Sequence, residues 1–80
     1  MIETIVKVDG MMCGMCEGHI NDAIRSHFQV KKVSSSHSKG RTVIRSQEAL
    51  DQAQLRQVID ATGYKVLDVV SRPVEKRGLL

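Results

Sequence analysis

The two cysteines of this 80-residue sequence are the residues best suited to chemistry. Cys13 and Cys16 are separated by two residues, after an alternating apolar run and before a helical pattern. One thiol in a loop and the other in the first turn of a helix can converge on one metal ion. Unpaired amides and the positive end of the helix dipole favour the thiolate forms that bind metals. The spacing therefore predicts a metal site at this cysteine pair.

Two histidines could add ligands to the pair. His19 lies three residues after Cys16, so its imidazole can share one flank of a helix with that sulfur. His37 is expected at the end of the second strand, on the face beneath the first helix. Either histidine could equally be a plain surface residue, but together they would complete a Cys2His2 set. Two thiolates alone suit Cu(I), whereas Zn(II) prefers four ligands in a tetrahedron, so the histidines bear on which ion is bound.

Length and composition restrict the class of protein. Eighty residues make a single domain, too small for a large buried substrate pocket. The net charge is +3, but the basic residues are scattered and the aromatic residues are only Phe28 and Tyr64, so nucleic-acid binding is not expected. Neither a cleaved signal nor an apolar run approaching the ~18 residues of a membrane span is found. A cytoplasmic location is expected, where a close cysteine pair binds metal or is redox-active more often than it forms a crosslink.

Hydrophobic periodicity and end signals predict four strands and two helices. The strands are expected at residues 2–9, 30–37, 41–46 and 64–70. The first helix is expected at about residues 15–28, and the second between an N-cap at Asp51 and a stop at Gly63. A domain of residues 1–72 is expected, followed by a flexible tail of residues 73–80.

The order βαββαβ predicts an α+β, ferredoxin-like fold, with a four-stranded antiparallel sheet and two helices on one face. The alternation of the first strand places Glu3 on the side opposite its buried residues. This topology brings the end of strand one, the start of helix one, the turn after strand two and the end of helix two to the same edge. The side chains expected there are Cys13, Cys16, His37 and Tyr64.

Three motifs occur together in the sequence. They are Gly10-Met11-x-Cys13-x-x-Cys16 at the start of the first helix, Val30-x-x-Val33, and Gly63-Tyr64. With these motifs, residues 2–70 resemble the heavy-metal-associated domain family, which contains copper chaperones and the N-terminal modules of metal-transporting P-type ATPases. The resemblance implies that Cys13 and Cys16 bind the metal, that Met11 packs beneath the loop, and that Tyr64 lies beside the site.

The sequence also departs from the family pattern. The segment His27-Phe28-Gln29-Val30 stands where relatives usually carry Leu-Pro-Gly-Val, and Ser35 and His37 occupy inward positions that are normally apolar. Met12 precedes Cys13 at a position where zinc-preferring members often have an acidic residue, which favours Cu(I). Met11, Met12 and Met15 are expected to pack, because thioether side chains fill irregular gaps well.

The sequence therefore predicts a Cu(I) chaperone or buffer that exchanges the ion with the cysteine pair of a partner. The partner implied by the resemblance is a metal-transporting P-type ATPase or another metal acceptor, and the protein is expected to be a monomer or a metal-bridged dimer. No enzymatic activity is expected, because the sequence offers no paired acid and base and no oriented nucleophile. The alternatives are a Zn(II)-binding module, a detached domain of a P-type ATPase, and a thiol-disulfide redox protein. The sole proline, Pro73, gives the redox alternative no cis-proline near the cysteines.

Overall fold

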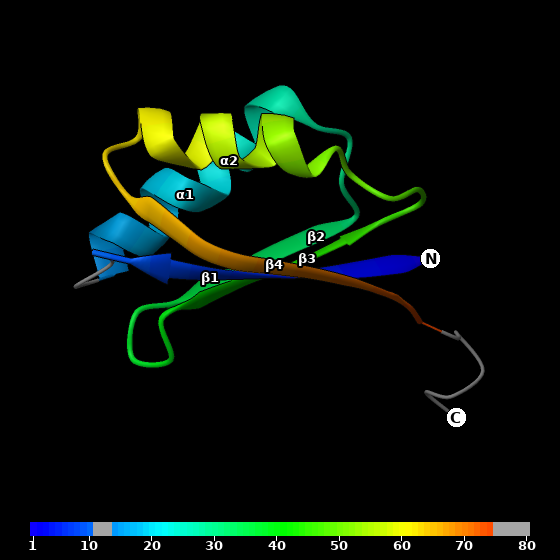
Figure 1. The fold of residues 1–80 in the computed structure, drawn as a ribbon, viewed down its shortest axis with the longest axis horizontal. Helices are drawn as coiled ribbons and strands as arrows, with labels where there is room; N and C mark the ends of the chain where they lie inside the picture. The colour runs from blue at the N-terminus through cyan, green and yellow to red at the C-terminus, as the bar shows by residue number, and fades with distance from the viewer. Residues whose placement is uncertain (11–13, 75–80) are drawn as a thin grey trace.

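The computed structural model of the chain describes residues 1–10 and 14–74, and Figure 1 shows its architecture. Met11, Met12 and Cys13, together with residues 75–80 of the predicted tail, lie outside the described residues. The elements follow the predicted order βαββαβ. They are β1 (Ile2–Asp9), α1 (Gly14–His27), β2 (Lys32–Ser36), β3 (Arg41–Ser46), α2 (Gln52–Ala61) and β4 (Lys65–Pro73).

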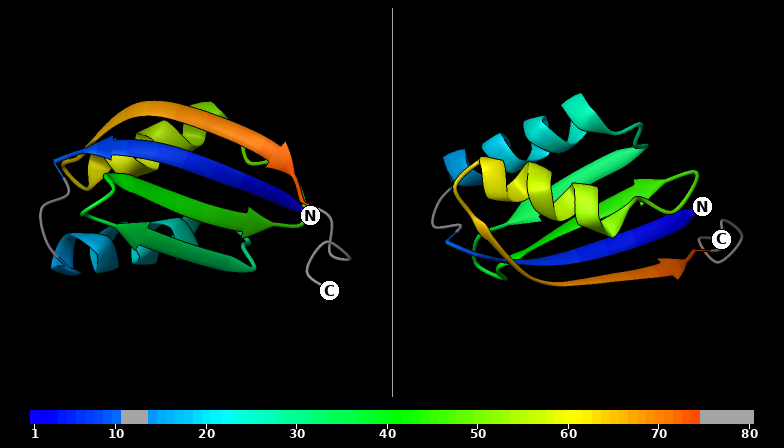
Figure 2. Two further views of the ribbon diagram at one scale, coloured as in Figure 1. Left: turned by 90° about the horizontal axis from the view of Figure 1, so that it is seen from below. Right: turned by 45° about the horizontal axis from the view of Figure 1, so that its top comes forward.

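Strand β1 lies inside the sheet and pairs with both of its neighbours. The strand order is β2-β3-β1-β4, and every pairing is antiparallel. Both helices cover one face of this sheet and leave the other face open (Figure 2). The predicted ferredoxin-like fold is confirmed.

The core lies between the helices and the sheet because apolar residues recur with the period of each element. Helix α1 contributes Ile20 and Ile24, and α2 contributes Leu55 and Ile59, each pair one helical turn apart. The inward residues of the strands complete the cluster. They are Val6, Val8, Val33, Ile44, Val66 and Val69.

Helix α2 begins and ends where the sequence predicts. The Asp51 carboxylate accepts hydrogen bonds from the amides of Ala53 (2.9 Å) and Gln54 (3.2 Å), which have no partner inside the helix. Gly63 follows the helix with φ of +96°, a left-handed conformation that favours glycine. These local signals fix the point at which the chain turns back toward β4.

The polar inward position at Ser35 is accommodated by a short hydrogen-bonded chain. The Ser35 hydroxyl donates to Oδ1 of Asn21 on α1 (2.6 Å) and lies 2.8 Å from the hydroxyl of Thr42 on β3. Because the single proton of Ser35 goes to Asn21, Thr42 must donate to Ser35. The contact joins α1 to β2 and β3 at a place where the family pattern would have apolar packing.

Strand β4 is longer than predicted, and the prediction of its end at Val70 is wrong. Ser71, Arg72 and Pro73 continue the pairing with β1, and the amide of Val74 donates to the carbonyl of Met1 (2.9 Å). Pro73 is tolerated because β4 is an edge strand, where one side of the backbone needs no partner. Strand β2 is shorter than predicted, and His37 lies in the turn that follows it.

Glu3 lies on the face of β1 opposite the core, as the alternation predicts, yet it is only 6% exposed. Its carboxylate accepts hydrogen bonds from Nε (2.9 Å) and Nη2 (2.6 Å) of Arg72 and from Nε of Arg45 (3.3 Å). Both arginines stand directly opposite Glu3 on the neighbouring strands. The hydrogen bond from Arg72 is the main reason that the pKa of Glu3 lies below its ordinary value of 4.5.

Replacing Glu3 by glutamine should lower the free energy of unfolding at pH 7 by about 1–2 kcal/mol, because charge-assisted hydrogen bonds are lost. The native pKa is lowered, so the stabilisation is fully present above the unfolded value near 4.5 and is lost as pH falls through the native pKa. Urea unfolding of both proteins should therefore converge at acidic pH. Glu48→Gln, an exposed glutamate, is the control, and equal stability of Glu3→Gln and the parent at pH 7 would contradict this account.

Candidate metal site

Four segments meet at one end of the domain, as the topology predicts. They are the end of β1, the start of α1, the turn between β2 and β3, and the segment between α2 and β4 (Figure 1). The amide of Val8 at the end of β1 donates to the carbonyl of Gly40 in the turn (2.9 Å). Gly40 has φ of +64°, a conformation in which a side chain is strained. The hydrogen bond between Val8 and Gly40 holds the turn against β1. We call this region the metal end.

Cys16 lies in the first turn of α1, partly exposed, and packs against the core. The helix N-terminus carries a partial positive charge, which stabilises a thiolate at this position. Cys13 and Met11 lie outside the described residues, so the structure gives no distance between the two sulfurs. The structure does show that Cys16, one member of the predicted pair, is held in α1 and packed against the core.

Tyr64 lies against Gly10 at the end of β1. It follows Gly63 at the end of α2 and is partly buried against the core. The ring lies close to the Gly10 backbone, because a Cβ atom added to Gly10 would be 3.5 Å from Cδ1 of Tyr64. Gly10 also has φ of +95°, in the left-handed region. The ring therefore covers the backbone at the point where the chain leaves β1 for the cysteine loop.

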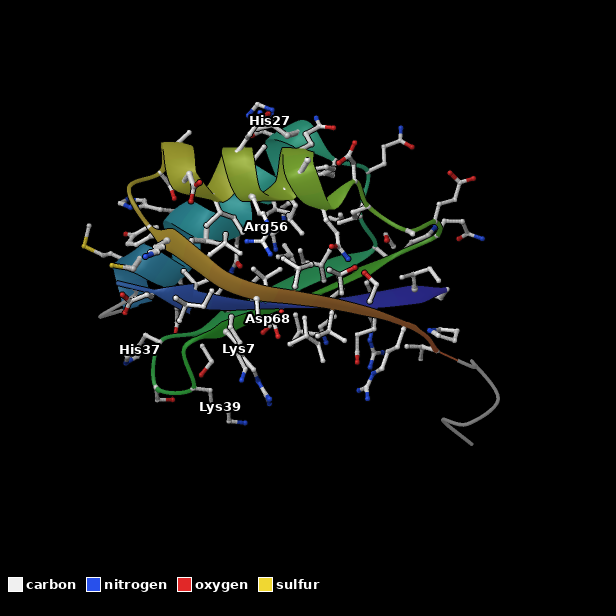
Figure 3. All side chains as sticks on the ribbon, viewed as in Figure 1. Lys7, His27, His37, Lys39, Arg56 and Asp68 are labelled. Atoms are coloured by element: carbon white, nitrogen blue, oxygen red, sulfur yellow. The ribbon has the colours of Figure 1, made fainter. Side chains whose placement is uncertain are left out.

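His37 is fixed by a residue that the sequence did not single out, Glu17 on α1. Oε2 of Glu17 accepts a hydrogen bond from the His37 amide (2.8 Å) and lies 2.7 Å from Nδ1 of the imidazole. A carboxylate only accepts, so Nδ1 carries the proton and Nε2 of a neutral ring keeps its lone pair. In metal sites such a carboxylate contact orients a ligating histidine. Figure 3 shows His37 on its turn at the metal end.

The contact with His37 also sets the charge of Glu17. The hydrogen bond from the His37 backbone, followed by that from its side chain, holds the pKa of Glu17 below its ordinary value of 4.5. Glu17, which is ionised at neutral pH in any case, therefore keeps its charge to lower pH, and the contact weakens as pH falls through the lowered pKa. The first turn of α1 thus keeps a negative charge next to Cys16.

His19 and Met15 are both exposed on the first turns of α1. The side chain of Met15 is 72% exposed, so the prediction that it packs is wrong. Among residues 1–10 and 14–74, no three His, Cys, Asp or Glu side chains come together as a possible metal site. Within that part of the chain, Cys16, His19 and His37 do not form a ready-made cage.

A wide hollow at the opposite end of the domain does not compete with this site. It lies between the end of α1 and the segment before α2, and neither cysteine nor histidine is among its lining residues. Phe28, Val30 and Leu50 form its apolar part. Its chemistry offers no soft-metal ligands.

Residues 5–65 match the heavy-metal-associated domain family. The match covers most of the chain, and the chain belongs to this family. It is a metal-binding domain and not an enzyme. A search of curated protein sequences gave no significant match.

Solved structures share the fold at low sequence identity. The CopZ metallochaperone has a TM-score of 0.74 at 23% identity, covering 81% of this chain and 98% of its own. The N-terminal domain of ZntA in its Zn(II) form has a TM-score of 0.74 at 24% identity, covering 84% and 90%. The yeast copper transporter domain Ccc2a, solved in apo and Cu(I)-loaded states, has a TM-score of 0.73 at 23% identity, covering 85% and 97%. The same fold therefore occurs in a domain solved in its Zn(II) form and in one solved with Cu(I).

In the part of the chain that the structure describes, no helix is long and apolar enough to cross a membrane.

Proposed function

We propose that the domain binds Cu(I) through Cys13 and Cys16 and delivers or buffers the ion for another metal-binding protein. The observation that carries the proposal is the position of Cys16, partly exposed in the first turn of α1 at the metal end. A thiolate there is stabilised by the helix N-terminus and is accessible to a second protein. Two soft thiolates suit Cu(I).

Transfer would proceed by exchange of thiolates while copper stays in the Cu(I) state. An incoming thiolate of the acceptor binds first and gives a three-coordinate ion, and one of the original sulfurs then leaves. The exposed thioether of Met15 beside Cys16 gives a partner an apolar contact at the point of exchange. A rigid scaffold below the loop lets this exchange occur without unfolding the domain.

The acceptor that fits this chemistry is a metal-transporting P-type ATPase or another protein with a cysteine pair. The same exchange between two copies of the chain would give a metal-bridged dimer. Without it, the protein would be a monomer. A cytoplasmic location belongs to the proposal, because the cysteines must stay reduced to bind Cu(I). A detached metal-binding domain of an ATPase would use the same site in the same way.

Loss of either cysteine should abolish tight binding of Cu(I), because a single thiolate remains. Cys13→Ser and Cys16→Ser are compared with the parent by competition for Cu(I) against a chromophoric chelator under anaerobic conditions. Both variants should lose at least 100-fold in affinity, about 2.7 kcal/mol. Ser34→Ala, on the side of the sheet away from the helices, is the control. Parent-like affinity in both cysteine variants would overturn the proposal.

The Glu17 contact favours one alternative, a Zn(II) site completed by His19 and His37. A ring whose Nδ1 is held by a carboxylate presents Nε2 for coordination, as zinc-binding histidines do. Affinity for Zn(II) would then fall as pH drops through the histidine range, because protonation removes the lone pair. In the Zn(II) alternative the two histidines bind the ion, whereas in the Cu(I) proposal only the cysteines do.

Substituting His19 and His37 together by alanine should weaken Zn(II) binding at least tenfold and leave Cu(I) binding nearly unchanged. His27→Ala is the matched control, because His27 ends α1 at the far end of the helix. Competition titrations with each ion measure the effect. Equal and small effects on both ions would show that the two histidines bind no metal.

A thiol-disulfide function has no support beyond the cysteines themselves. The sole proline, Pro73, stands opposite Ile2 near the N-terminus, at the end of the sheet away from Cys16. Multiple turnovers of a disulfide substrate that disappear in Cys13→Ser would nevertheless move the protein to that class.

A further inference from the structure

The face of the sheet opposite the helices is uncovered and regularly organised. Figure 2 shows it from below, with both helices behind the strands. The register places three rows of its side chains across all four strands, and the pair Asp9 and Lys65, whose charges cancel, lies beyond them on β1 and β4. The row at the metal end contains Ser36, Arg41, Lys7 and Asp68. The middle row contains Ser34, Val43, Ile5 and Val70, and the far row contains Lys32, Arg45, Glu3 and Arg72.

These three rows, which we call the open face, carry the whole excess charge of the chain. They contain five basic and two acidic side chains, an excess of three positive charges. The remaining basic and acidic residues of the sequence are seven each and cancel, so the net charge of +3 is that of the open face. The buried carboxylate of Glu3 does not remove this excess, because Arg72 is 63% and Arg45 35% exposed around it.

An apolar floor separates the two charged rows. Val70 is 50% exposed, and Ile5 and Val43 are partly exposed beside it. Lys32, Ser34, Val43 and Arg45 surround a shallow hollow at one side of this floor. Each charged row lies two residues along the strands from the middle row, about 7 Å away. The apolar side chains lie on the three strands β3, β1 and β4, so the floor is about 10 Å long, with Ser34 of β2 at one end.

We propose that the open face is a docking site for an acidic polypeptide segment. The segment carries apolar side chains along its centre, which cover the middle row, and carboxylates on both sides, which meet Arg41 and Lys7 on one rim and Lys32 and Arg72 on the other. The site faces away from the helices and does not involve the cysteines. It is independent of which ion the metal end binds.

Two other kinds of partner fit the open face less well. Nucleic acid is disfavoured because the aromatic residues Phe28 and Tyr64 pack against the core, so this face has no platform on which bases could stack. A membrane surface is disfavoured because the apolar side chains are short and lie between longer basic ones, where they cannot insert into lipid. A polypeptide can reach the floor and both rims together.

The test uses the full chain with metal removed by chelation and follows its amide resonances as a probe peptide is added. The probe is a synthetic twelve-residue peptide of alternating Glu-Asp and Leu-Val pairs, compared with a peptide in which lysine replaces every acidic residue. The acidic peptide should shift resonances of the three rows and bind more weakly as salt is added. The lysine peptide should not bind.

Paired charge reversals locate the site. Lys7→Glu with Arg41→Glu should weaken binding of the acidic peptide at least tenfold, whereas Arg25→Glu with Arg56→Glu, the same charge change on the helices, should change it less than threefold. Figure 3 shows Lys7 below the sheet and Arg56 on the helix side. Val70→Asp, a single change in the apolar floor, should also weaken binding tenfold in protein shown to be folded by its amide spectrum.

Three results would overturn the proposal. One is the absence of binding at millimolar peptide, and another is an equal loss in the two charge-reversal pairs, which would reflect net charge alone. The third is tighter binding of the same face to anionic phosphatidylglycerol vesicles or to single-stranded DNA than to the peptide.

Discussion

The structure depends most on the pairing of β1 with both β3 and β4. The side chains of a strand alternate between two faces, so a slip of one residue would exchange the core residues Thr4, Val6 and Val8 for the outward ones. The same register determines where β1 ends, and therefore where the chain leaves the sheet toward the cysteines. The bridge from Glu3 to Arg45 and Arg72 holds the three strands together at the opposite end of β1.

At the metal end, polar contacts between distant segments replace the apolar packing that the family pattern leads one to expect. Glu17 holds the turn after β2 through two contacts with His37, and the Ser35 hydroxyl holds α1 through Asn21. These contacts hold Glu17 of α1 and the imidazole of His37 together at the metal end. Both contacts are made by the protein's own side chains, so we expect the turn to keep its position without a metal ion. This differs from a zinc finger, whose fold depends on its metal.

Local signals allowed much of the fold to be predicted from the sequence. Asp51 and Gly63 mark the ends of α2, and the alternation of apolar residues marks β1, because capping and periodicity need only neighbouring residues. The extension of β4 to Pro73 and the partner of His37 were not predictable in this way. Both depend on residues far away in the sequence, and nothing in the local pattern of Arg72 or Glu17 indicates which side chain each one meets.

The most direct test of the account is an amide spectrum of the chelated protein before and after one equivalent of Cu(I) under anaerobic conditions. We expect a well-dispersed spectrum without metal, and shifts confined to residues 10–19, 37–40 and 63–65 once Cu(I) is added. A poorly dispersed spectrum that becomes ordered only with metal would contradict it. So would copper-dependent shifts that leave Cys13 and Cys16 unaffected.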